Sequence, residues 1–282
     1  MKILLSKTKQ VFLFLCSALE QGREIKEALY KTYSFIYKEL KVVPSFPICI
    51  SRNKTIAHYV YNSDKKKVFL KEGDYLRIDL GLQLKENKTD YARSFIFKKG
   101  KLEPFCCFGT KICLLGSKEL NLESTEENFA KNVYNKIVST SKDYYISPEL
   151  WGHRVGKKLH ERPFLSFYRD PFLSKLKFIE GVYCVEVFVG KQKFGLVSRK
   201  NNFLYICTKR SSFFFKFRTR FFSKQMVLFE FSFLQAPLEL LEKELAQKKV
   251  KREPFFSSSI REIEHREEMF ELNKNNQVKI LS

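Results

Sequence analysis

Residues 70–81 read Leu-Lys-Glu-Gly-Asp-Tyr-Leu-Arg-Ile-Asp-Leu-Gly. From position 75 onward, tyrosine, arginine and finally Asp79 alternate with leucine and isoleucine. Because successive side chains of a β-strand point to opposite faces, this alternation predicts a strand over residues 75–84 with one apolar face. Residues 91–97 follow after a charged turn and are the expected hairpin partner of this strand.

Upstream of this hairpin, residues 1–42 carry apolar side chains at spacings of three and four, which is typical of amphipathic helices. A break at Gln21 and Gly22 predicts two helices. Two prolines then end the helical zone, because proline lacks the amide donor that a helix interior needs. The short β-rich runs that follow cover residues 46–50 and 55–61.

Downstream of the hairpin the chain mixes helices and strands. Residues 100–125 show no clear pattern, and residues 209–224 are basic and aromatic. The elements that we expect are a helix over 126–141, a strand over 181–189, a helix opened by Pro237 and a closing hairpin over 260–282. This mixture predicts an α+β fold.

The composition fits a folded protein. The chain has 282 residues, of which 44% are hydrophobic and 29% charged, so disorder and a membrane bundle are both excluded. Its net charge of +21 suits an acidic partner such as RNA or a ribosome, but codon drift in an A/T-rich genome would also produce it. Seven cysteines without a Cys-x-x-Cys pair indicate reduced thiols, and no apolar run approaches the ~20 residues that span a bilayer. We therefore expect a cytoplasmic protein.

Five side chains suit hard or borderline divalent metals: Asp79, Asp90, His153, Glu186 and Glu264. The two aspartates belong to the expected hairpin, whose turn would place them side by side. Two carboxylates pressed together in a half-buried place repel each other unless a cation lies between them. Taken singly, each acid is better explained as an ordinary surface carboxylate, so the hypothesis depends on the whole ordered set.

The motifs of the first half resemble a known family. Residues 46–53, followed by Ala-His-Tyr at 57–59, are similar to the pattern Phe-Pro…Ser-x-Asn…Ala-His-Tyr. Residues 70–81 are similar to Leu-Lys-Glu-Gly-Asp…Ile-Asp-x-Gly, and Asp90 with Ala92 fits the second metal aspartate. These are motifs of the methionine aminopeptidases of the pita-bread fold, which the chain resembles, particularly type 2.

The motifs of the second half follow in the family's order. Residues 152–156 with His160 resemble the histidine-ligand motif, residues 181–188 the first glutamate motif, and residues 263–265 the closing Glu-His. The resemblance implies an α+β pita-bread fold in one domain over residues 1–282. Its parts would be N-terminal helices within 1–42 and a type 2-like helical insert over 200–255.

The resemblance also implies a dinuclear centre with two divalent ions (Co, Mn, Fe or Zn), a bridging hydroxide, and release of the initiator Met from nascent polypeptides. Asp79 would bind one metal, His153 and Glu186 the other, and Asp90 and Glu264 would bridge. The catalytic residues that it implies are His58 near the scissile amide, His160 at the oxyanion and Glu186 for proton transfer. The family also implies a monomer without a membrane partner.

A non-catalytic alternative stays open. Proliferation-associated proteins share the type 2 architecture and bind ribosomes and RNA. The run over residues 209–224 carries six cations interleaved with phenylalanines, which suits such a role. A packed element with solvated cations would look the same. A third reading, a proline dipeptidase, is less favoured by the histidine context at 57–59 and by the insert.

Overall fold

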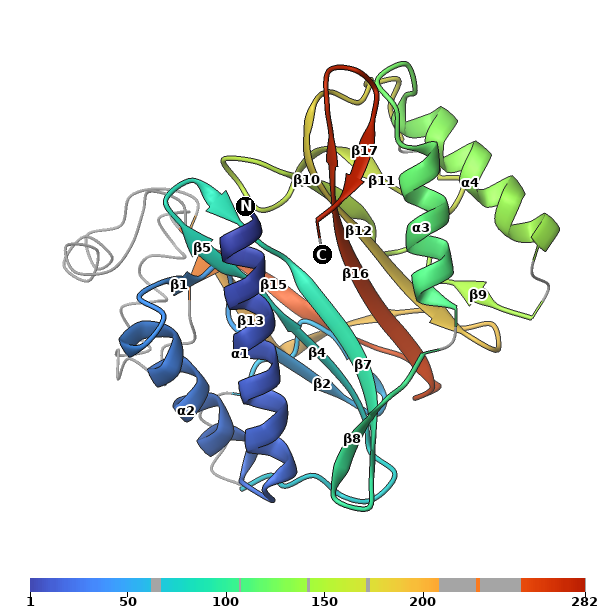
Figure 1. Ribbon diagram of the computed structural model, residues 1–282. Coiled ribbons are helices and arrows are strands. Elements are labelled where there is room, and N and C mark those ends of the chain that lie inside the picture. Colours follow the sequence, from blue (N-terminus) through green and yellow to red (C-terminus); the bar gives the residue numbers. More distant parts are fainter. Residues whose placement is uncertain are drawn as a thin grey trace.

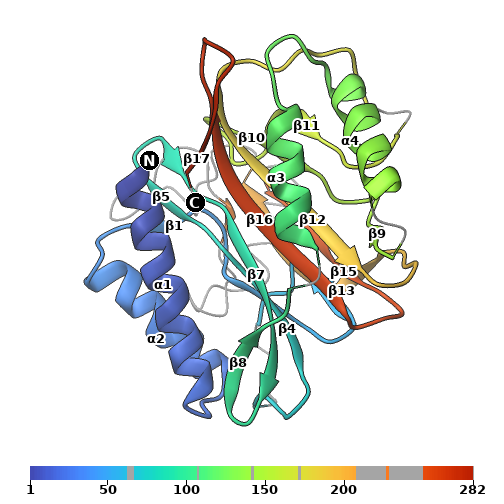
Figure 2. The same cartoon turned by 45° about the vertical axis from the view of Figure 1, so that its right-hand side comes forward.

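The computed structural model describes residues 1–61, 67–106, 108–140, 143–170, 173–207, 227–228 and 250–281. It combines helices with four sheets, which confirms the α+β prediction. Figure 1 shows α1 and α2 on one side of the sheets and α3 and α4 on the other, and the turned view in Figure 2 agrees. No described helix has the length and apolar character needed to cross a membrane. The basic run over 209–224 and the helix expected at Pro237 lie outside the described residues.

The N-terminal half consists of two helices packed on a sheet. The helices are α1 (Lys2–Glu20) and α2 (Ile25–Lys38), as predicted. The sheet has the order β2 (Cys49–Arg52), β4 (Tyr75–Leu80), β7 (Tyr91–Lys98) and β8 (Lys101–Pro104). A small sheet beside it contains β1 (Val43–Pro44), β5 (Leu82–Leu84) and β6 (Asn87–Lys88). The helices bury residues such as Leu15 and Leu29 against Ile78 and Leu80, which forms the first apolar core.

The predicted hairpin is confirmed as the antiparallel pair β4–β7. Its register places Asp79 opposite Ala92 and Leu80 opposite Tyr91. The break after β4 falls at Gly81, where an added Cβ would lie 2.0 Å from the carbonyl oxygen of Thr89. Glycine is therefore the residue that lets the two sides of the hairpin approach each other here.

The C-terminal half repeats the plan of helices on one sheet face. Its sheet has the order β11 (Glu161–Leu165), β10 (Gly152–Val155), β12 (Gly181–Gly190), β16 (Ile263–Leu272) and β17 (Val278–Ile280), and β9 (Tyr145–Ile146) also pairs with β12. The helices are α3 (Gly109–Glu119) and α4 (Glu126–Thr140). Together they bury the second apolar core, which includes Ile112, Phe129, Val185 and Val187.

Three further strands join β3 (Thr55–Ala57) in a separate sheet. These strands are β13 (Val197–Cys207), β14 (Val227–Leu228) and β15 (Val250–Ser257). The expected strands over 181–189 and in the closing hairpin are confirmed as β12, β16 and β17, whereas the run over 55–61 is shorter than expected. Helix α3 was not predicted, because two glycines and the lack of a side-chain cap on Phe108 hide its pattern.

Polar contacts join the two halves between their cores. The fully buried Arg77 of β4 donates from Nε to the Ile263 carbonyl oxygen at 2.7 Å and from Nη1 to the Asn53 carbonyl oxygen at 2.7 Å. The amide N–H of His265 donates to Ser94 Oγ at 2.7 Å, so β7 lies along β16. The two large apolar cores lie on the outer sides, so the space between the halves holds polar side chains beside two smaller apolar clusters.

Candidate metal centre

The N-terminal half contributes two buried aspartates. Asp79 lies near the end of β4 and is 7% exposed, and Asp90 lies directly before β7 and is 3% exposed. Burial raises the pKa of Asp79 well above its usual range, and the negative charges of Asp90 and Glu186 raise it further. The hairpin register therefore places these two acids close enough for the charge of one to act on the other.

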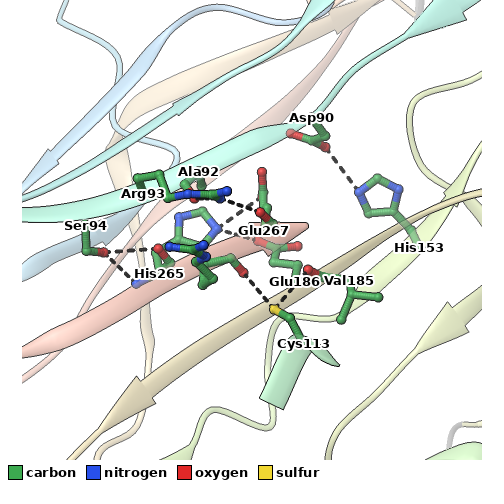
Figure 3. Close-up of polar contacts among 11 residues, drawn as sticks. Asp90, Ala92, Arg93, Ser94, Cys113, His153, Val185, Glu186, His265 and Glu267 are labelled. Carbon is green, nitrogen blue, oxygen red and sulfur yellow. Dashed lines mark hydrogen bonds and ion pairs between the residues drawn. The ribbon is translucent and has the colours of Figure 1, made fainter. Parts of the chain in front are cut away.

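His153 of β10 lies against Asp90. Its Nε2 is 3.3 Å from Asp90 Oδ2, a contact drawn as a dashed line in Figure 3, and its Nδ1 is 3.3 Å from the Arg154 carbonyl oxygen. Burial alone lowers the pKa of His153, but the hydrogen bond and charge of Asp90, with the charge of Glu186, outweigh it and raise the pKa. If Nδ1–H donates to the carbonyl, the lone pair of Nε2 points toward the acids.

The third side of the site is the β12–β16 pair. Its register places Glu186 directly opposite Glu267, so both carboxylates share one face. His265, two residues before Glu267, lies on the same face (Figure 3). Its Nε2 is 3.1 Å from Glu186 Oε1 and 3.1 Å from Glu267 Oε1.

The predicted placement of Glu264 in this cluster was wrong. Glu264 is 1% exposed, but its Oε2 accepts hydrogen bonds from the backbone N–H groups of Phe108 and Gly109, both at 2.9 Å. It thus caps the N-terminus of α3, where a negative charge also interacts favourably with the helix dipole. Strand alternation is the physical reason, because Glu264 and Glu267 differ by an odd number of positions and face opposite sides of the sheet.

Glu267 and His265 are the site residues that the sequence reasoning missed. Charged side chains occupy both faces of β16, so alternation alone does not distinguish the metal-facing residues. The number of positions between a residue and the closing hairpin is a better signal of the face it occupies, because the turn that begins at Asn273 sets the end of β16. The neighbouring Arg266 faces α3 with Glu268, and its Nε donates to Glu268 Oε1 at 2.9 Å.

The electrostatics of the cluster favour the binding of a cation. Burial raises the pKa of Glu267 well above its usual range, and the charges of Asp90, Asp79 and Glu186 add to the effect. Among the described residues, Asp79 Oδ1, Asp90 Oδ1 and Glu267 Oε2 are buried without a hydrogen-bond partner. Buried carboxylate oxygens are rarely left in this state, and a divalent cation would satisfy them. Oxygen and imidazole donors suit Mn, Fe, Co or Zn, so the residues fit a metal centre.

Several donor groups lie close enough to share a cation. In each group one donor atom per residue lies within 4.8 Å of the others. The groups are Asp90–His153–His160, Asp90–Cys184–Glu267 and Glu186–His265–Glu267. Two of them contain Glu267, and none in the described part of the chain contains Glu264.

The two other predicted histidines lie at the rim of the cluster. The His160 ring is in edge contact with that of His153, with centroids 4.2 Å apart. Desolvation and the charge of His153 hold the pKa of His160 below its usual range, although water screens part of this effect because the residue is exposed. The half-buried His58 follows β3 and adopts φ 60°. Its ring is in edge contact with that of Phe256, with centroids 5.5 Å apart.

Two halves, each a sheet covered by helices, meet at a buried carboxylate and histidine cluster, and this arrangement is the pita-bread fold. The model of metallopeptidase family M24 matches residues 1–181. The chain belongs to this family.

Curated relatives are methionine aminopeptidases. A methionine aminopeptidase 2 of Bacillus subtilis is 27% identical over 144 residues, which cover 50% of this chain and 56% of that protein. A methionine aminopeptidase of Borreliella burgdorferi is 29% identical over 183 residues, covering 57% and 65%. The chain thus matches less than two thirds of the length of these relatives.

Solved structures share the fold. A methionine aminopeptidase from Thermotoga maritima superposes with a TM-score of 0.57 at 17% identity, covering 95% of this chain and 91% of that one. A thermophilic Arx1 superposes with a TM-score of 0.77 at 10% identity, covering 100% and 89%.

Proposed function

We propose that the protein is a methionine aminopeptidase that removes the initiator Met from nascent polypeptides. The observation that carries this proposal is the buried cluster of four acids beside His153, three of which have an oxygen without a hydrogen-bond partner among the described residues. Such a cluster has a high electrostatic cost unless cations bind to it. Family membership and relatives named methionine aminopeptidase support the same activity. We further propose that the enzyme works in the cytoplasm as a monomer.

The proposed ligands are Asp79, Asp90, His153, Glu186 and Glu267, with Glu267 in the place predicted for Glu264. Four carboxylates balance the four positive charges of two divalent ions, so the loaded site is close to neutral. When bound, such ions lower the pKa of water toward about 7 and polarise a carbonyl group.

The chain's own residues position these groups and handle protons. The contact of His153 Nδ1 with the Arg154 carbonyl oxygen favours the tautomer whose Nε2 is free to bind a metal. His160 stays neutral at physiological pH because its pKa is lowered, so its ring N–H is available to a developing oxyanion. We assign Glu186 to proton transfer and His58 to a hydrogen bond with the scissile amide.

The test is hydrolysis of Met-Ala-Ser by the purified protein loaded with Mn or Co. The wild type should release Met, and Asp90→Asn should release none, because the variant loses one of the four carboxylates that would hold the metal ions. Glu264→Gln is the matched control. It also removes a buried carboxylate charge near the site but should retain activity, since Glu264 contacts α3.

The net charge of +21 favours a second candidate, a non-catalytic homologue that binds ribosomes or RNA. The basic run over 209–224 would provide the contact. Absence of Met release with every metal, together with salt-dependent co-sedimentation with ribosomes, would support this candidate and contradict the peptidase. Met release with co-sedimentation would support an aminopeptidase that works at the ribosome.

A further inference from the structure

His265 has no assigned role in the five-ligand centre. Its ring is 1% exposed and stacks on Phe188, with centroids 4.1 Å apart and an interplanar angle of 16°. The β12–β16 register holds it on the face that carries Glu186 and Glu267. We propose that His265 is a sixth protein ligand, which binds through Nε2 the cation that Glu186 and Glu267 hold. This inference rests on the proposed metal centre.

The distances around Nε2 fit a shared cation. Two donor atoms that each lie about 2.1 Å from one metal, at tetrahedral or octahedral angles, are about 3.0–3.4 Å apart. The separations of His265 Nε2 from Glu186 Oε1 and from Glu267 Oε1 are both 3.1 Å. The Asp90–His153 contact, at 3.3 Å, falls in the same range.

A hydrogen bond accounts for this arrangement less well. A neutral imidazole carries one N–H, so a hydrogen-bonded Nε2 would share a single proton between two carboxylate oxygens in a weaker, three-centre bond. A cation, in contrast, attracts both carboxylates and the nitrogen lone pair together. Glu267 Oε2, buried and without a hydrogen-bond partner among the described residues, stays available to a second cation.

The consequence is a centre with two imidazoles, His153 and His265. Imidazole favours Zn, Co and Fe over the harder Mn, which prefers carboxylate and water ligands. The site should therefore bind Co or Zn more tightly than Mn. Metal binding by Nε2 and a hydrogen bond donated by Nε2 also place the ring proton of His265 on different atoms. It lies on Nδ1 if Nε2 binds the metal and on Nε2 if Nε2 donates a hydrogen bond.

The test counts metal-bound histidines by proton NMR of the protein loaded with two equivalents of Co(II). A coordinated imidazole shows a ring N–H signal that is strongly shifted by the metal and disappears in D2O. The wild type should show two such signals from His153 and His265, and His265→Gln should show one. Cobalt binding to His265→Gln, measured by calorimetry, should be at least about 10-fold weaker for one equivalent. Glu264→Gln, one position away on the opposite face, should keep both signals.

The inference is overturned if the doubly loaded wild type shows one shifted N–H signal, a result that needs no variant. It is also overturned if His265→Gln folds and binds two equivalents as tightly as the wild type. Either outcome leaves the proposed peptidase intact, because the five ligands would suffice. If the wild type binds no cobalt, the metal centre itself is wrong and His265 loses its role with it.

Discussion

At the scale of single residues, the acids of the site repel each other when no metal is bound. Asp79 and Glu267 are buried among other acids, and both have a raised pKa. A folded-state pKa above the unfolded value means that the folded protein binds more protons, so stability is highest at low pH. It falls as the pH rises from about 4, the unfolded value, through the folded pKa of each acid.

We therefore expect the melting temperature of the metal-free protein to fall between pH 5 and pH 8. Removing one charge with Glu267→Gln should flatten this dependence and stabilise the metal-free protein at pH 8 by at least about 1 kcal/mol, the equivalent of one pKa unit. Thermal melts in a chelator, followed by circular dichroism, measure both effects. A wild type and a variant with parallel pH profiles would show that Glu267 does not carry the repulsion.

At the scale of elements, β16 serves two sites because its faces differ. His265 and Glu267 face the acids, whereas Glu264 reaches the N-terminus of α3. Helix α3 depends on this contact, because its own N-cap residue Phe108 has no side-chain acceptor. A strand thus supplies the cap that the helix sequence lacks.

Glu264→Gln should weaken this cap by about 1 kcal/mol, because the amide loses the charge that favours the helix N-terminus. In a chain of this size the melting temperature would fall by about 2–4 °C. The number of bound metal ions, measured by elemental analysis, should not change. If the variant instead lost a metal equivalent, the assignment of Glu264 to the helix would be incorrect.

Sequence patterns were sufficient where one face of an element is apolar. The alternation that leads to Asp79 predicted β4 and its partner β7, and the three-and-four spacing predicted α1 and α2. They were insufficient in β16, where Glu264, His265, Arg266 and Glu267 are all polar, so either face looks like a site. The cap of α3 is also a long-range contact, between residues about 155 positions apart, which local patterns do not contain.

At the scale of the whole molecule, the proposed metal site lies between two halves whose large apolar cores are separate. Asp79 and Asp90 come from the first half, and His153, Glu186 and Glu267 come from the second. Arg77 already links the halves through backbone carbonyl groups. We propose that residues 1–282 form one domain in which 200–255 is an insert, and that bound cations strengthen the contact between the halves.

Metal removal should therefore destabilise the chain as a whole. At a free metal concentration 100 times the dissociation constant, binding stabilises the folded state by about 2.7 kcal/mol. Chelation should lower the melting temperature accordingly, and amide hydrogen exchange should increase in both β4–β7 and β12–β16. Asp90→Asn serves as the comparison, because its melting temperature should respond little to metal. Faster exchange in one half alone would contradict a role of the metal in joining the halves.

The register of β12 against β16 also limits how the chain can change in length. A slip of one residue would turn His265 and Glu267 toward α3 and bring Arg266, a cation, among the carboxylates. Insertions and deletions within β16 should therefore be rare in functional versions of this protein. The turn at 273–276 connects β16 to the short β17. A change of length there does not shift β16 against β12, so each face of β16 keeps its side chains.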